Sequence, residues 1–583
     1  MRPATAVPSA ALALVLLAGC TGEDRSDEPA GQGSEDAPAA AVTVAPDAER
    51  TLVADPDPVA AAVSTSRALF QSSPVAVVTA AGETGDELLG AVSAVGLGVP
   101  MLLGGEAGGD ALAAELDRLG VQTVLAVGEG AGALLPEDVD VVAVPADAEA
   151  VEQATGLTLD DGREVPEADR AAAVAELAPD ALPALRAEPA AAAPAAPSAS
   201  ESTSPGSSES ASSSSASSSS ASSSSASSGD DAELPDLAAP EPLTDVLVIS
   251  SGRPQSVAGI ATARAAGAEV LLTGDVADPR ASTEVVERMA DQPTVVVLGA
   301  DLAGAPGIDW KLDTAASGTQ LPGGGQLLFP EHTMIALYGI PGSGALGLLG
   351  EQDLPASIAR AQQYADEYRP LVDTTVVPTF EIIATVASAS AGPDGNYSAE
   401  QDVETLRPWV EQAGAAGMYV VLDLQPGRTD FLTQAKQYQS LLELPYVGLA
   451  LDPEWRLGPN EVHLRQIGQV GVDEVNQVVT WLADLTRANA LPQKLLVLHQ
   501  FQVRMITDRE RLDTSRDELA IMVHVDGQGS QPAKQDTWEV LHRNAPAPLY
   551  WGWKNFIDED VPMISPRETI EQVHPTPELV TYQ

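Results

Sequence analysis

The chain has few cations and almost no cysteine. It carries 30 Lys and Arg against 84 Asp and Glu, a formal net charge of -54 over 583 residues. So acidic a surface repels nucleic acid and other polyanions, and the sequence contains no basic patch that reverses this. Cys20 is the only cysteine, which excludes a disulfide within the chain. With 44 % hydrophobic residues, most of the chain can still bury a core, and we expect no nucleic-acid partner.

Signature motifs of several enzyme classes are also missing. The 6 histidines are scattered and form no His-Glu-x-x-His, as a zinc protease needs. There is no Gly-x-Ser-x-Gly elbow of a serine hydrolase, because Gly342-Ser343-Gly344 is typical of a turn. The stretch from Ala80 to Gly85 lacks the full Gly-x-Gly-x-x-Gly of a dinucleotide site. The sequence predicts no cofactor and no metal, although a Zn or Mn site is an alternative that would use Asp423, Asp452, His499 and His524.

Long apolar runs are absent as well, except at the start. A single cation, Arg2, precedes the apolar run Ala10 to Ala18, which is shorter than the ~20 residues that span a bilayer. This pattern predicts a secretory signal over residues 1–20. Its end, Leu17-Ala18-Gly19-Cys20, resembles the lipobox of bacterial lipoproteins, which implies lipid attachment at Cys20 and a location on the extracytoplasmic face of the cell membrane. The alternative is an ordinary cleaved signal with a chance cysteine.

Two stretches have a composition that cannot form a core. Residues 21–57 are acidic and rich in Ala, Pro and Gly, which predicts a disordered tether. Residues 189–241 begin with Ala and Pro and continue as an almost pure Ser and Ala tract, which predicts a disordered linker. The acidic, Ala-rich, Lys-poor usage fits a GC-rich actinobacterial genome.

An α/β pattern occurs twice, on either side of the linker. In residues 58–188, Pro74 to Thr79, Val99 to Leu103 and Thr123 to Val127 are expected strands with helices between them. In residues 242–310 the same order returns, and Glu269 to Gly274 and Thr294 to Gly299 match the second and third strands. We predict a Rossmann-like two-repeat α/β domain with parallel strands, in which both copies pack into a single sheet across the linker.

This repeat, over Pro58 to Val144 and Pro242 to Ala303, resembles the cell-wall-binding repeat type 2 family. The resemblance implies a surface protein whose repeats bind anionic wall polymers without covalent attachment. The family usually has three repeats, and only two are visible here. A pure scaffold role for the two copies is the alternative.

Residues 326–583 alternate strands and helices over about 250 residues, which predicts a β/α, TIM-like barrel. Seven strands are clear, from Thr333 to Gly339 through Leu549 to Trp553. The eighth is expected at Met563-Ile564 or is absent, which would leave the barrel incomplete. Aromatic residues, only 4 % of the chain, concentrate after Tyr338, and aromatic side chains commonly hold sugars.

Polar residues follow five successive barrel strands, where barrel enzymes place their sites. The expected substrate-binding residues are Trp455, His499, His524, Trp551, Trp553 and Lys554. The expected catalytic residues are Asp423, Asp452, Glu454 and Asp526. Strand alternation places Asp452 and Glu454 on one side, and likewise His524 and Asp526.

Paired carboxylates beside aromatics are what glycoside hydrolysis needs. Leu451 to Trp455 resembles the Asp-x-Glu endings of the fourth strand in chitinase-like and lysozyme-like barrels. The resemblance implies a glycoside hydrolase acting on cell-envelope polysaccharide. We expect Glu454 to be the general acid, because its longer side chain reaches past the strand end beside Trp455, where desolvation holds its proton, and Asp452 or Asp526 to be ionised. A non-enzymatic wall-binding scaffold is the alternative function. For Asp452 and Glu454 the alternative is a structural role, in which they cap the strand and pair with Arg456.

Overall fold

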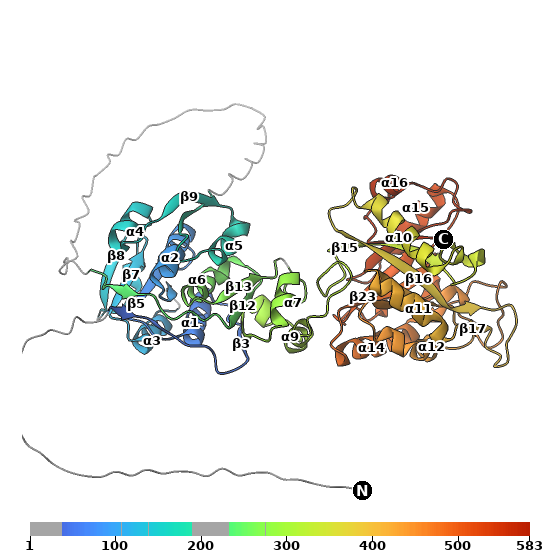
Figure 1. The fold of residues 1–583 in the computed structure, drawn as a ribbon, viewed down its shortest axis with the longest axis horizontal. Helices are drawn as coiled ribbons and strands as arrows, with labels where there is room; N and C mark the ends of the chain where they lie inside the picture. Colours follow the sequence, from blue (N-terminus) through green and yellow to red (C-terminus); the bar gives the residue numbers. More distant parts are fainter. Residues whose placement is uncertain (1–37, 106–107, 138, 189–232, 275) are drawn as a thin grey trace, which may run out of the picture.

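The computed structural model describes residues 38–105, 108–137, 139–188, 233–274 and 276–583. It contains an α/β unit followed by a β/α barrel (Figure 1). The expected signal with Cys20, the first part of the expected tether and most of the expected linker lie outside the described residues. Within the described residues, every helix is too short or too polar to cross a bilayer.

The first copy forms a parallel sheet of four strands in the order β6-β5-β7-β8. Its strands are β5 (Val75–Ala80), β6 (Met101–Gly104), β7 (Thr123–Val127) and β8 (Asp140–Val144). Its helices are α2 (Thr84–Leu97) and α3 (Gly109–Leu119). Both end at a glycine in the left-handed conformation, Gly98 at φ 68° and Gly120 at φ 70°, which is why these glycines stop the helices.

The second copy forms a separate sheet in the order β13-β12-β14-β3. Three strands come from the copy itself: β12 (Val246–Ser250), β13 (Glu269–Leu272) and β14 (Thr294–Leu298). The fourth, β3 (Arg50–Val53), precedes the first copy in the sequence and pairs in parallel with β14. The expected disordered tether over residues 21–57 therefore extends too far, because β3 lies within it and Val53 is buried in this sheet. β3 has only four residues, which is too short a run to be recognised in the sequence.

Helices, and not strand pairing, join the two copies. α1 (Pro58–Leu69) and α2 pack on α6 (Val257–Ala265), and apolar residues of both copies form one continuous core. Thr262 of α6 exchanges two hydrogen bonds with the backbone of Met101, with Oγ1 to N at 3.1 Å and Oγ1 to O at 3.0 Å. The prediction that the copies pack together is thus correct, and the prediction of a single sheet is wrong.

Shorter elements complete this unit. The remaining helices are α4 (Ala148–Thr155), α5 (Arg170–Ala175), α7 (Thr283–Met289), α8 (Ala300–Ala303) and α9 (Ile308–Ala315). The remaining strands are β1 (Ala39–Ala40), β2 (Val42–Thr43), β4 (Phe70–Ser72), β9 (Asp160–Val165), β10 (Pro183–Ala187) and β11 (Leu237–Ala238).

The C-terminal unit is a closed parallel barrel, which confirms the predicted fold class. Its strands are β15 (His332–Gly339), β16 (Thr375–Ala387), β18 (Tyr419–Leu424), β19 (Val447–Leu451), β21 (Lys494–Gln500), β23 (Leu519–Val525), β24 (Tyr550–Asn555) and β25 (Leu579–Tyr582). Closure results because β25 pairs with both β24 and β15, and β15 pairs with β16. The eighth strand is therefore β25 at the end of the chain, and the expectation of Met563-Ile564 or of an incomplete barrel is wrong.

Helices surround the barrel. They are α10 (Leu354–Tyr368), α11 (Val403–Ala415), α12 (Phe431–Gln437), α13 (Gln439–Leu442), α14 (Val472–Ala488), α15 (Gln531–His542) and α16 (Pro566–Gln572). The short strands β17 (Ser398–Glu400), β20 (Val470–Gly471) and β22 (Ile506–Thr507) lie in the loops. Caps set the helix starts: Asp353 accepts from the backbone of Ala356 ahead of α10, and Ser565 forms a capping box with Glu568 at α16.

Strand alternation divides the barrel into an inner and an outer core. On β21, Leu495 and Val497 belong to the apolar cluster inside the barrel, whereas Leu496 and Leu498 pack against the helices. Phe329 closes the bottom of the inner cluster, at the N-terminal ends of the strands. The inner core is apolar in its lower layers, so polar inward residues are confined to the C-terminal ends of the strands, where the site is built.

The α/β unit contacts the barrel at the opposite end from that site. The Nζ of Lys311 of α9 lies 2.7 Å from Oδ2 of Asp517, a barrel residue just before β23. The same Nζ lies 3.2 Å from Oδ2 of Asp278, within the α/β unit. Arg280, in the α/β unit, donates a hydrogen bond from Nη2 to the backbone carbonyl of Asp517 at 3.2 Å. Because Asp517 lies at the N-terminal end of β23, the contact leaves the C-terminal mouth of the barrel facing away from the α/β unit (Figure 1).

Candidate functional site

A layer of buried polar side chains forms the top of the barrel interior. Each member is an inward-facing residue of a different barrel strand, most of them near the C-terminal end of the strand, and the layer extends around the barrel. Its members are Tyr338, Glu381, Asp423, His499, His524, Lys554 and Thr581, and each is at most 4 % exposed. Burying this many ionisable groups is costly unless they compensate one another or serve a function.

His499 lies at the centre of this layer. Its Nδ1 is 3.2 Å from Oδ2 of Asp526 and donates a hydrogen bond to it. On the other side of the ring, Nε2 lies 2.8 Å from Oε1 of Glu381 and 3.8 Å from Oδ1 of Asp423. Glu381 is fixed in turn by Thr581, whose hydroxyl donates to Oε2 at 3.0 Å. Three carboxyl groups that are far apart in sequence thus meet around one imidazole, and Nδ1 of His524 lies 3.2 Å from its Nδ1.

Asp423 is held from the side by Tyr338. The Tyr338 hydroxyl donates to Oδ2 of Asp423 at 2.8 Å and accepts from the Gln425 amide at 3.3 Å. The ammonium of Lys554 lies 3.7 Å from the centre of the Tyr338 ring. Burial raises the pKa of Asp423 to about 6, and the neighbouring His499 limits that rise.

Asp452, Glu454 and Trp455 lie on the turn that follows β19. Asp452 is buried, and the next three residues, Pro453–Trp455, form a single 3-10 turn that brings Glu454 to the mouth. Burial first, and then the charge of Asp526, raise the pKa of Glu454 to about 7. Burial and the charge of Glu454 hold the pKa of Asp452 well above its usual range. In contrast, the hydrogen bond from His499 lowers the pKa of Asp526 despite burial.

A pocket of about 550 Å³ opens above this layer. Its polar lining includes Tyr338, Gln425, Asp452, Glu454, Asp526 and Lys554. Its aromatic lining consists of Trp455, Phe501 and Phe556 besides the tyrosine. The pocket therefore combines a proton-carrying carboxyl, a second carboxylate and flat apolar surfaces, which is the combination that a sugar ring and its glycosidic bond require.

Two predicted substrate-binding residues, Trp551 and Trp553, are not in the pocket. β24 turns Gly552 and Lys554 inward, so these tryptophans face the helices and pack around Trp538 of α15, with ring centres at 6.0 and 5.6 Å. Their assignment as substrate-binding residues is wrong, because strand alternation puts them on the opposite side from Lys554. Glycine at position 552 leaves room for the His524 ring, which a Cβ there would overlap.

The remaining predicted residues do converge. Asp423, Asp452, Glu454 and Asp526 lie in or directly beneath the pocket, with His499 and His524 below and Trp455 and Lys554 on its wall. Arg456 is not their partner, because its guanidinium pairs with Glu474 at 3.0 Å. Sequence reasoning missed Glu381 and Tyr338. Glu381 lies in the middle of the apolar run of β16, and a lone charge in such a run was the available signal.

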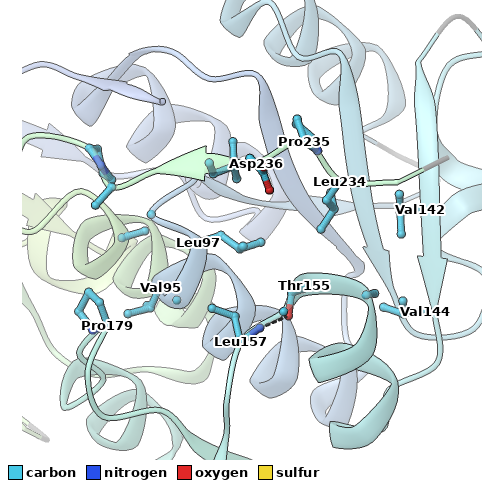
Figure 2. A pocket seen from close by; sticks show the side chains of 18 of the residues that line it. Val95, Leu97, Val142, Val144, Thr155, Leu157, Pro179, Leu234, Pro235 and Asp236 are labelled. Carbon is cyan, nitrogen blue, oxygen red and sulfur yellow. Dashed lines mark hydrogen bonds between the residues drawn. The ribbon is translucent and has the colours of Figure 1, made fainter. Parts of the chain in front are cut away.

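A larger cavity, about 1300 Å³, lies in the α/β unit. Figure 2 shows it between the C-terminal end of α2, β8 and the segment around Leu234, with Val95, Leu97, Val144 and Leu157 facing it. Its lining mixes apolar side chains with polar groups in about equal parts, and its charged members are Glu233, Asp236 and Arg264. We place the functional site in the barrel, because chemistry requires the convergent titratable groups that this larger cavity does not bring together.

Comparisons with known proteins add little to this assignment. No family model matches the chain, and no curated protein matches its sequence. Cwp6 from Clostridium difficile is a structural match with 11 % identity and a TM-score of 0.28, which covers 65 % of this chain and 63 % of that one. A TM-score this low does not establish a shared fold. The resemblance to wall-binding repeats remains a prediction, and the function must be argued from the residues of the barrel.

Proposed function

We propose that the barrel hydrolyses a glycosidic bond in a cell-envelope polysaccharide. The observation that carries this proposal is that Glu454, whose pKa is raised to about 7, opens into the same pocket as Asp526, whose carboxylate form is stabilised by His499. Glu454 donates its proton to the glycosidic oxygen as the bond to the anomeric carbon breaks. Asp526 acts from the same pocket, on water or on the anomeric carbon, which is the division of roles that glycosidases use.

The charge of the pocket restricts the substrate. Asp452, Glu454 and Asp526 line it, against a single lysine, Lys554. An anionic polymer would be repelled at close range, and the net charge of -54 adds to this at longer range. We therefore propose a neutral or amino-sugar glycan as the barrel substrate, stacked on Trp455 and Phe556.

The experiment is a screen of the full chain against neutral envelope polysaccharides near pH 6, with release of reducing ends as the readout. Cleavage by the wild-type chain and its loss in Asp526→Asn would support the proposal. Binding of a glycan without cleavage by the wild-type protein would instead favour a binding scaffold.

We further propose that the protein is attached to the outer face of the cell membrane through a lipid on Cys20. The support is the lipobox-like sequence Leu17-Ala18-Gly19-Cys20 after a short apolar run. A Cys20→Ser variant should move from the membrane fraction to the medium or the soluble fraction, because two acyl chains supply the stable part of the anchoring. Unchanged membrane partitioning of this variant, followed by immunoblotting, would rule the anchor out.

A further inference from the structure

Three side chains of the polar layer bring ligand-type atoms together below the pocket. One such atom each from Glu381, His499 and His524 lies within 4.8 Å of the others. All three residues are fully buried. Oε1 of Glu381, Nε2 of His499 and Nε2 of His524 are buried atoms without a hydrogen-bond partner. Buried polar atoms are nearly always satisfied, so unsatisfied atoms on three neighbouring side chains point to a missing ligand.

The contact between His499 and Glu381 has the spacing of two ligands on one ion. Nε2 and Oε1 are 2.8 Å apart, yet neither atom is satisfied by a hydrogen bond. Two donors that each lie about 2.0–2.2 Å from one metal ion are about 3 Å apart when their bonds to the ion meet at a right angle, and about 3.3–3.6 Å apart in a tetrahedron. Oδ1 of Asp423, also unsatisfied, lies 3.8 Å from the same Nε2 and is available as a further ligand.

The surroundings orient these groups as in a metal site. Asp526 accepts the Nδ1–H of His499, and in the neutral tautomer of that imidazole Nε2 carries a lone pair on the side where Glu381 lies. Thr581 holds the other oxygen of Glu381 at 3.0 Å. Outer partners of this kind, a carboxylate on the far nitrogen of the imidazole and a hydroxyl on the carboxylate, fix metal ligands in other proteins.

The charge balance favours a cation. Against one lysine, Lys554, and the imidazoles of His499 and His524, five carboxyl groups lie in or next to the polar layer. They belong to Glu381, Asp423, Asp452, Glu454 and Asp526. Burial makes the ionised forms of Glu381 and Asp423 expensive, and a divalent ion beside them would offset that cost.

We propose that Glu381, His499 and His524 bind a divalent transition-metal ion beneath the pocket floor. Imidazole combined with carboxylate suits Zn²⁺, Mn²⁺ or Fe²⁺ better than Ca²⁺ or Mg²⁺, which prefer oxygen ligands alone. This inference goes beyond the proposed hydrolysis and does not depend on it, because the ion would be held by residues outside the Glu454 and Asp526 pair. Asp526 keeps its hydrogen bond from Nδ1 of His499 when Nε2 is metal-bound.

The test measures metal content and thermal stability of the full chain. Wild-type protein dialysed against Zn²⁺ and then metal-free buffer should retain about one ion per chain by elemental analysis. Removal by a chelator should lower the melting temperature, and added Zn²⁺ should restore it. His524→Gln should weaken zinc binding by at least about 100-fold, whereas His574→Gln, which changes an exposed histidine, should not alter it.

Glu381→Gln is a second variant of the same shape, in case His524→Gln does not fold, and circular dichroism verifies the fold of each. Titration calorimetry of the wild type with Zn²⁺ and Mn²⁺ decides the matter if both variants unfold. Protein that keeps no metal and shows neither heat nor a melting shift with either ion would overturn the proposal and leave a metal-free cluster in which the carboxyls share protons.

Discussion

Replacing Glu454 by Gln should lower the rate of glycan cleavage by about 10²–10⁴-fold, the usual cost of losing a general acid. The amide has nearly the same shape but offers no proton to the leaving oxygen. Glycan affinity should change little, because Trp455 and Phe556 remain on the pocket wall. Rates and affinity are measured on the same polysaccharide, by reducing-end release and by calorimetry.

The matched control is Glu510→Gln, which makes the same change at an exposed glutamate remote from the pocket lining. It should retain wild-type activity. The Glu454 variant should also keep its stability, because Arg456 pairs with Glu474 and does not depend on Glu454. A fully active Glu454→Gln enzyme would place the acid elsewhere, and a variant that is inactive only because it unfolds would favour a structural role.

The pH profile should carry the signature of the same residue. Burial and the charge of Asp526 raise the pKa of Glu454 to about 7, so the proton is present at pH 6 and is lost as the pH rises through 7. Activity should therefore fall about tenfold per pH unit above this value. The proton on Glu454 also stabilises the folded protein. This contribution to the free energy of unfolding is complete below the ordinary glutamate pKa and is lost as the pH rises through about 7. Glu454→Gln should lack this alkaline limb.

Replacing Trp553 by Ala should destabilise the barrel by about 3–5 kcal/mol, the usual cost of removing a buried tryptophan. Its ring is fully buried, packs against Trp538 at 5.6 Å, and donates Nε1–H to Asn555 at 2.9 Å. Glycan affinity of the molecules that remain folded should be unchanged, because the ring points away from the pocket. Urea unfolding followed by tryptophan fluorescence measures the loss.

Trp455→Ala is the matched variant, since it removes the same side chain from the pocket wall. We expect the reverse pattern, with weakened glycan binding and stability within about 1 kcal/mol of wild type, because this ring is only half-buried. Equal losses of affinity in the two variants would contradict the outward placement of Trp553.

Much of the barrel could be predicted from sequence because its strands are short apolar runs separated by helices with clear caps. Seven strands could be identified in this way, and β25 could not, because Leu579–Tyr582 is a short run at the very end of the chain. Its role depends on pairing with β15, more than 200 residues earlier. Closure is a property of the whole barrel and has no local pattern.

The candidate site was predictable where residues extend past a strand end and unpredictable where they lie inside one. Asp452 and Glu454 follow β19 and stand out by position. Glu381 lies within β16, where the alternation of inward and outward residues decides whether a charge is tolerated. The same alternation explains the error at Trp551 and Trp553, since a strand-end position alone does not determine which face a residue occupies.

The position of β3 in the second sheet has a consequence for the order in which the chain can mature. Arg50–Val53 leaves the ribosome well before its partner β14 (Thr294–Leu298) exists. At the usual rate of about 5–20 residues per second, the strand waits on the order of tens of seconds for its neighbour. The first copy can form its own sheet during that interval, whereas β3 still lacks the strand with which it pairs. β3 is therefore a segment that a chaperone specific for extended chains could bind before β14 has been synthesised.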